Sequence, residues 1–130
     1  MHRVSHVLDP AALQRVDFVA RRGDPMLLAR LVALFMADTP DRLRDLRDAV
    51  EHRDNAAVRA LAHGLRGGSE TFGAHEMVAQ CDFLEHMPPE WVDAQIEMHL
   101  AALIEAFERT RIALASLLTR QNKSGGDAPP

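Results

Sequence analysis

The sequence predicts an all-α fold: an antiparallel four-helix bundle with a short extra N-terminal helix. Apolar residues recur at the three- and four-residue intervals of amphipathic helices over most of the chain. Capping residues and prolines divide this pattern into separate helices, and no stretch alternates apolar and polar residues as a strand does. With 130 residues, 47% of them hydrophobic and 26% charged, the chain suits one soluble globular domain. We assign residues 1–120 to the bundle and expect 121–130 to form a disordered tail.

Two Asp-Pro pairs predict where the first two helices begin, because Asp caps a helix N-terminus and Pro fits its first turn. Asp9-Pro10 precedes a short helix, and Asp24-Pro25 precedes a longer one that runs to about His52. Pro40 lies inside the longer helix, and a break at Asp38-Thr39 is one interpretation. The apolar spacing continues across the proline, so we favour a single kinked helix.

Three further helices complete the bundle. Asp54 is expected to cap the third helix, which ends near Gly73, a residue suited to a left-handed C-terminal cap. The fourth helix is expected from about Ala74 to His86, and the last from about Glu90 to Arg120. The apolar residues expected to face inward in the four main helices are Leu28, Leu31, Val32, Phe35, Leu43, Leu46, Val50, Val58, Leu61, Leu65, Phe72, Met77, Cys81, Leu84, Ile96, Leu100, Leu103, Phe107, Leu114, Leu117 and Leu118.

Composition excludes several classes of function. The formal net charge is −4 and no basic patch is evident, which argues against nucleic-acid binding. No apolar run approaches the roughly 18 residues of a membrane span, and no signal peptide is evident. Cys81 is the only cysteine, so it forms no internal disulfide, and a reducing cytoplasm is the simplest location. The histidine spacing predicts neither a metal site nor an intrinsic cofactor.

One histidine lies on the outer face of the third helix. Val58, Leu61, Leu65 and Phe72 fall within an arc of about 80° at helical spacing. His63 lies roughly 160° from the centre of that arc, so its ring is expected to face water. An exposed imidazole is a good nucleophile near neutral pH and can carry a covalent group on nitrogen.

Glycines surround this histidine at positions 64, 67 and 68. Each glycine inside a helix costs about 1 kcal/mol relative to alanine. Gly64 and Gly68 flank the apolar arc, where close helix packing could offset that cost. Gly67 lies about 40° from His63 on the outer face, where an incoming partner is the more plausible reason for a missing side chain.

The stretch from Ala62 to Ala74, AHGLRGGSETFGA, resembles the signature of histidine-containing phosphotransfer (HPt) domains. That signature has a His, a Leu two residues on, a Lys or Arg three on, a Gly four on, and an apolar-Gly-Ala ending. The segment from Phe35 to Leu43, with its proline, is similar to the family's second helix. Cys81-Asp82-Phe83-Leu84-Glu85 is similar to the end of its fourth helix. The resemblance extends over roughly Pro10 to Leu118.

The resemblance implies a role for each site residue. His63 corresponds to the phosphoacceptor, Arg66 to the basic residue beside the phosphoryl group, and Glu85 to a position that hydrogen-bonds the imidazole in some members. Ser69 occupies a small polar position near the site. The alternatives are an ion pair of Arg66 with Glu70, a solvated Glu85, and a Ser69 hydroxyl bonded back to its own helix.

By the same resemblance, the chain is a phosphorelay carrier without kinase activity of its own. It would accept a phosphoryl group from the aspartate of a receiver domain, in a response regulator or hybrid kinase, and pass it to another receiver. Mg²⁺ would be held by the receiver. The expected docking face comprises Arg59, Gly64, Arg66, Gly67 and Glu70, on a carrier that is a monomer. The alternatives are a helical module that regulates a receiver or enzyme by binding alone, and a phosphoacceptor domain taken from a longer kinase.

Overall fold

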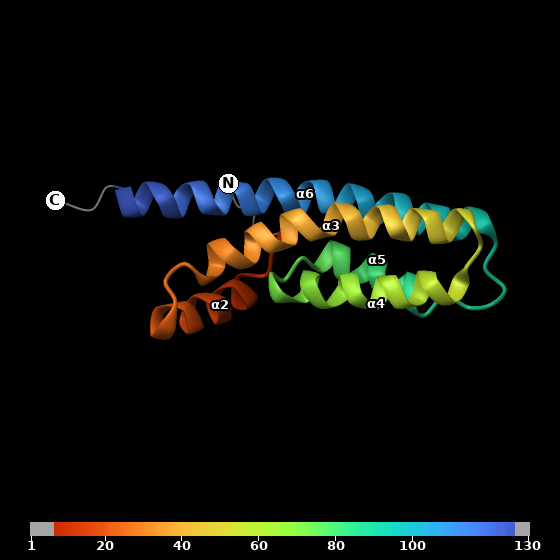
Figure 1. The fold of residues 1–130 in the computed structure, drawn as a ribbon, viewed down its shortest axis with the longest axis horizontal. Coiled ribbons are helices and arrows are strands. Elements are labelled where there is room, and N and C mark those ends of the chain that lie inside the picture. The colour runs from red at the N-terminus through yellow and green to blue at the C-terminus, as the bar shows by residue number, and fades with distance from the viewer. Residues whose placement is uncertain (1–6, 127–130) are drawn as a thin grey trace.

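The computed structural model describes the backbone of residues 7–126 and the side chains of residues 7–120. Within this range the chain forms five helices: α2 (Pro10–Gly23), α3 (Leu27–Glu51), α4 (Asn55–Thr71), α5 (His75–Glu85) and α6 (Asp93–Gly126). Helices α3 to α6 run alternately up and down as an antiparallel bundle, and α2 lies beside one end of it (Figure 1). The predicted fold class is confirmed. The most extensive helix–helix contact is between α4 and α5, the two helices that carry the site.

Asp9 begins α2 as expected, because its carboxylate accepts a hydrogen bond from the Ala11 N–H at 3.0 Å and Pro10 occupies the first turn. The second Asp-Pro pair behaves differently, and α3 begins at Leu27 rather than at Pro25. The Asp24 carboxylate accepts from the Met26 N–H at 3.0 Å, so this pair forms a turn before the helix. Beyond that turn, α3 is one continuous helix across Pro40, as the apolar spacing predicts.

The link between α4 and α5 depends on Gly73. Asp54 caps α4 by accepting from the Ala57 N–H at 3.1 Å, and the helix ends at Thr71. Gly73 has φ +64°, the left-handed conformation expected of it. It also lies against Asp9, whose N–H donates to the Gly73 carbonyl at 2.8 Å. A Cβ at position 73 would lie 2.7 Å from the Asp9 backbone nitrogen, so glycine is required here twice over.

The last helix differs from its predicted bounds at both ends. It begins at Asp93, three residues after Glu90, because the chain turns after Pro88-Pro89 and the Val92 N–H donates to the Gln95 side chain at 3.1 Å. It continues to Gly126, so residues 121–126 of the expected tail are helical. A helix that has formed extends more readily than a new one starts. Residues 127–130 of that tail lie outside the described part of the chain.

The core fixes the rotation of α4 and α5 about their axes. Phe35 of α3 meets Phe72 at 5.2 Å and Phe107 of α6 at 5.9 Å between ring centroids, both edge to face. Ala62 and Leu65 of α4, like Cys81 and Leu84 of α5, are at most 2% exposed. Because these residues face inward, the intervening positions on both helices are turned outward on one side of the bundle.

Candidate functional site

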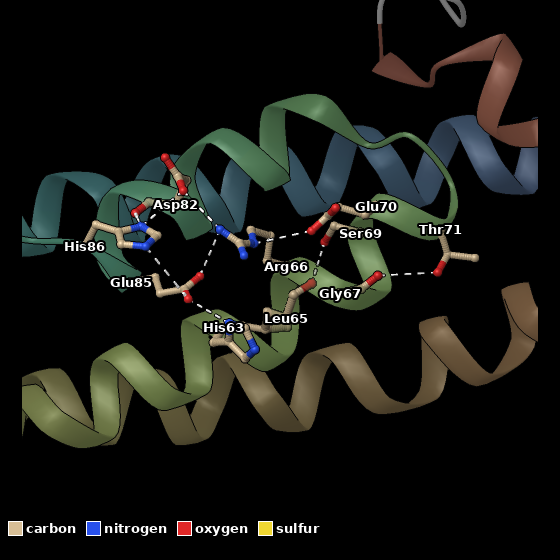
Figure 2. A network of polar contacts seen from close by, with 10 residues as sticks. All are labelled: His63, Leu65, Arg66, Gly67, Ser69, Glu70, Thr71, Asp82, Glu85 and His86. Atoms are coloured by element: carbon tan, nitrogen blue, oxygen red, sulfur yellow. Dashed lines mark hydrogen bonds and ion pairs between the residues drawn. The ribbon is translucent and has the colours of Figure 1, made fainter.

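His63 projects from the outer face of α4, and 66% of its side chain is exposed. The exposure predicted from helical spacing is therefore confirmed. The ring does not float freely, because its Nδ1 lies 2.7 Å from Oε2 of Glu85 on α5 (Figure 2). A nucleophilic imidazole needs an acceptor that holds the N–H of its other ring nitrogen, and Glu85 on the neighbouring helix provides one.

Glu85 is the last residue of α5, and only 16% of its side chain is exposed. An ionised carboxylate carries no proton, so in this hydrogen bond the His63 Nδ1–H is the donor. In a neutral imidazole the other nitrogen, Nε2, then carries the lone pair. The contact thus selects one tautomer and leaves Nε2 as the nucleophilic atom.

Arg66 lies one turn after His63 and is surrounded by carboxylates. Its Nη1 donates to Asp82 Oδ1 at 3.1 Å, and its Nε forms an ion pair with Glu70 at 3.3 Å. Glu85 Oε1 is also 3.1 Å from Nη1, close enough for an ion pair. That oxygen is buried, yet no donor among the described residues is aligned to hydrogen-bond it. The Arg66–Glu70 pair that the sequence offered as an alternative therefore coexists with contacts that place Arg66 at the site.

Two site residues were missed by the sequence analysis. Asp82 was noted only within a motif, and His86 was considered only as a possible metal ligand. Asp82, Glu85 and His86 are spaced i, i+3 and i+4, so they share a face of α5, and this spacing was the available signal. His86 Nδ1 lies 3.1 Å from both the Asp82 carbonyl and its Oδ1, and His86 Nε2 is 4.0 Å from Glu85 Oε2.

The three glycines of α4 have different surroundings. A Cβ at Gly67 would have no neighbour within 4 Å, consistent with an open outer face. A Cβ at Gly64 would lie 3.2 Å from the tip of Arg42, and one at Gly68 would lie 3.6 Å from the Phe35 ring, both on α3. A methyl group at position 68 would make an ordinary van der Waals contact, and one at position 64 would require only the flexible tip of Arg42 to shift. Close helix packing therefore requires neither glycine, whereas Gly67 faces open solvent.

The other predicted residues lie at the margins. Glu70 is exposed beside Arg66, and Arg59 is half-buried, donating to the Met87 carbonyl at 3.3 Å. Ser69 is fully buried, and its hydroxyl donates to the Leu65 carbonyl at 2.8 Å, which is the back-bonded alternative. The same hydroxyl lies 3.8 Å from the Met77 sulfur in the core, so it faces the inner side of α4 rather than the imidazole.

A groove of about 200 Å³ runs between α3 and α4 next to the site. Its walls are mainly apolar, with Asp38 and Arg42 at the α3 side and Gly64 beside His63. Cys81 lies beneath the site and is fully buried, and this burial raises the pKa of its thiol to about 12.

The described residues contain no group of three or more histidines, cysteines or acidic residues placed to hold a metal ion. None of the helices between residues 7 and 126 is long and apolar enough to cross a membrane.

Comparison with known proteins decides the family, because the model of the Hpt domain matches residues 30–111, more than half of the chain. The chain belongs to the Hpt domain family. Among solved structures, this Hpt domain is similar to histidine-containing phosphotransfer protein B (HptB) from Pseudomonas aeruginosa PAO1. The two are 26% identical, with a TM-score of 0.71 over 88% of this chain and 96% of that one. No curated protein matches the chain significantly. The protein is thus a phosphorelay carrier of the HPt type, a family whose members interact with receiver domains.

Proposed function

We propose that His63 is the phosphoacceptor and that the phosphoryl group is carried on its Nε2. The observation that supports this most directly is the exposed ring whose Nδ1–H is held by Glu85 at 2.7 Å. We further propose the direction of transfer: from the phosphorylated aspartate of one receiver domain, in a hybrid kinase or response regulator, to the aspartate of another.

The transfer step follows from this geometry. The Nε2 lone pair attacks phosphorus, an N–P bond forms, and the bond between phosphorus and the aspartate oxygen breaks. The aspartate leaves as a carboxylate. The proton stays on Nδ1, so the phosphorylated ring gains positive charge, and the Glu85 carboxylate beside it offsets that charge. The reverse sequence at a second receiver restores the neutral ring.

The surroundings of His63 suit a visiting domain. Gly67 opens the outer face, and Gly64, Glu70 and Arg59 lie on the same helix. Arg66 and the His63 ring contact the same carboxylate, Glu85, so the guanidinium is the cation we assign to the phosphoryl oxygens. The receiver would bring the Mg²⁺ that its own acidic pocket binds, so the carrier needs neither a nucleotide nor a cofactor. We propose that the carrier acts as a cytoplasmic monomer through a transient interface of modest size.

The test is incubation with a receiver domain that carries a radiolabelled phosphoryl group. The wild-type protein should take up acid-labile label, and His63→Gln should take up none. His52→Gln is the matched control, because His52 is exposed at the end of α3 and its Nδ1 lies 2.7 Å from the Asp48 carbonyl, so it takes no part in the site. That variant should be labelled like the wild type.

Two results would contradict the proposal. Label that persists in His63→Gln would place the phosphoryl group elsewhere. A wild-type protein that binds receivers with the same affinity as His63→Ala and never takes up label would be an interaction module that acts by binding alone.

A further inference from the structure

The guanidinium of Arg66 is committed to carboxylates while His63 carries no phosphoryl group. Nη1 contacts Asp82 and Glu85, and Nε contacts Glu70 (Figure 2). The closest approach to each of these three carboxylates is made by Nη1 or Nε rather than by Nη2. The cation beside the phosphoacceptor is therefore already shared among three anions.

Asp82 differs from the other two carboxylates in what it touches. Glu85 contacts the His63 ring directly, and Glu70 follows Arg66 by one turn on the same helix. Asp82 belongs to α5, is 57% exposed, and binds Arg66 and His86 through the same oxygen, Oδ1. No hydrogen bond or ion pair between the described residues joins it to His63, so its influence on the phosphoryl group acts through Arg66 and through its charge.

The carboxylates around Arg66 outnumber it. Glu70, Asp82 and Glu85 carry three negative charges against its single positive charge, so with the His63 and His86 rings neutral this cluster has two negative charges in excess. Two further cations lie outside the cluster: Arg59, one turn before His63 on α4, and Arg42 of α3, whose tip lies against Gly64. A phosphoryl group adds about −1.5 to −2 more. Charges on neighbouring turns interact within the Debye length of about 8 Å at physiological salt. A phosphoryl group on His63 thus meets an excess of negative charge on the side that faces α5.

We propose that Asp82 is a positioning residue that holds Arg66 toward α5 and thereby destabilises phosphorylated His63, favouring onward transfer over storage. The inference rests on the proposed role of His63. Loss of the Asp82 charge has two effects in the same direction. It reduces repulsion of the phosphoryl group, and it removes one of the three carboxylates that compete with phosphoryl oxygens for the guanidinium.

The main experiment compares wild type with Asp82→Asn, in which an acceptor oxygen remains but the charge is lost. Each protein is equilibrated with the same phosphorylated receiver, and the ratio of phosphorylated carrier to phosphorylated receiver is measured. We expect Asp82→Asn to raise this ratio about two- to tenfold, and the increase to shrink at 1 M salt.

A second readout is independent of the receiver. Each protein is phosphorylated with phosphoramidate, a small chemical donor, and the phosphoryl group is titrated by ³¹P NMR. A neighbouring carboxylate raises the pKa of a phosphoryl group, so this pKa should be lower in Asp82→Asn than in wild type. A purely structural role for Asp82 would leave the titration unchanged.

Glu108→Gln is the charge-matched control. Glu108 is an exposed residue of α6 whose carboxylate pairs with Arg111 at 2.7 Å, so this variant also loses one negative charge and one Arg–carboxylate pair. It should behave like the wild type in both assays. Glu70→Gln, which removes another partner of Arg66, should shift both readouts in the same direction as Asp82→Asn and serves as the second probe if that variant folds poorly.

The outcomes separate the two proposals. A wild-type protein that takes up no label on His63 overturns the proposed function and this inference with it. If the wild type is labelled on His63, but Asp82→Asn has an unchanged or lower ratio of phosphorylated carrier to phosphorylated receiver and the same ³¹P titration, only the proposed role of Asp82 is overturned. An equal shift in Glu108→Gln would reduce the effect to net charge and would also overturn the role of Asp82.

Discussion

A single substitution at Gly67 should change the stability of the protein and its rate of phosphoryl transfer in opposite directions. Its Cβ position has no neighbour within 4 Å, so a larger side chain meets no atom of the folded protein. Glycine inside a helix is less favourable than other residues by roughly 0.5–1 kcal/mol. We therefore expect Gly67→Gln to stabilise the protein, which for a domain of this size raises Tm by about 2–4 °C.

The same side chain should obstruct the docking face beside His63. We expect Gly67→Gln to lower the rate of phosphoryl transfer from a receiver at least tenfold, equivalent to about 1.4 kcal/mol in the barrier. Gly67→Ala should give a similar gain in stability with a smaller loss of rate, because a methyl group occupies less of the interface. Thermal unfolding followed by circular dichroism and single-turnover transfer kinetics measure the two effects.

The control is Ala115→Gln, which places the same side chain at an exposed position of α6. It should transfer at the wild-type rate. If Gly67→Gln also transfers at the wild-type rate, the clearance argument for this glycine is wrong. If Gly67→Gln lowers Tm, the conclusion that position 67 faces open solvent is wrong instead.

Three further predictions concern Glu85, Cys81 and His99. Glu85→Ala should slow phosphoryl uptake by His63 roughly ten- to a hundredfold because it releases the tautomer, whereas Glu85→Gln, which keeps an acceptor oxygen, should retain most of the rate in the same kinetic assay. Burial raises the pKa of the Cys81 thiol to about 12, so iodoacetamide should label it at neutral pH only after unfolding in urea, as mass spectrometry would show. Burial lowers the pKa of His99 below its ordinary 6.5, so the unfolded state binds more protons and stability falls as pH drops through this range. The urea midpoint should therefore decrease from about pH 7.5 to about pH 5.5, and His99→Gln should flatten that dependence.

The sequence was most informative where one helix alone determined the result. The apolar spacing of α4 placed His63 on the outer face, and Asp54 and Gly73 marked the ends of that helix through local hydrogen bonding and backbone conformation. The apolar spacing likewise predicted that α3 continues across Pro40, as it does. These features depend on residues within a few positions of one another, so the sequence alone predicts them.

What the sequence did not show was the relation between α4 and α5. The Asp82 and His86 contacts depend on how far each helix is rotated and shifted along the other, and packing of Leu65, Cys81 and Leu84 determines this. Ser69 does not share this limit, because its hydrogen bond is local. The sequence offered a hydroxyl bonded back to its own helix, and the structure shows that hydroxyl donating to the Leu65 carbonyl.

The junction between Asp9 and Gly73 has a practical consequence for anyone who dissects this protein. Leu8 is 1% exposed, and the adjoining N–H of Asp9 satisfies the Gly73 carbonyl between α4 and α5. A fragment trimmed to the matched range of 30–111 would lose both, together with the buried Ala113 and Leu114 of α6. Expression boundaries, affinity tags and fusions are therefore best placed ahead of Val7, so that the Asp9 N–H can still bind the Gly73 carbonyl in the turn before α5.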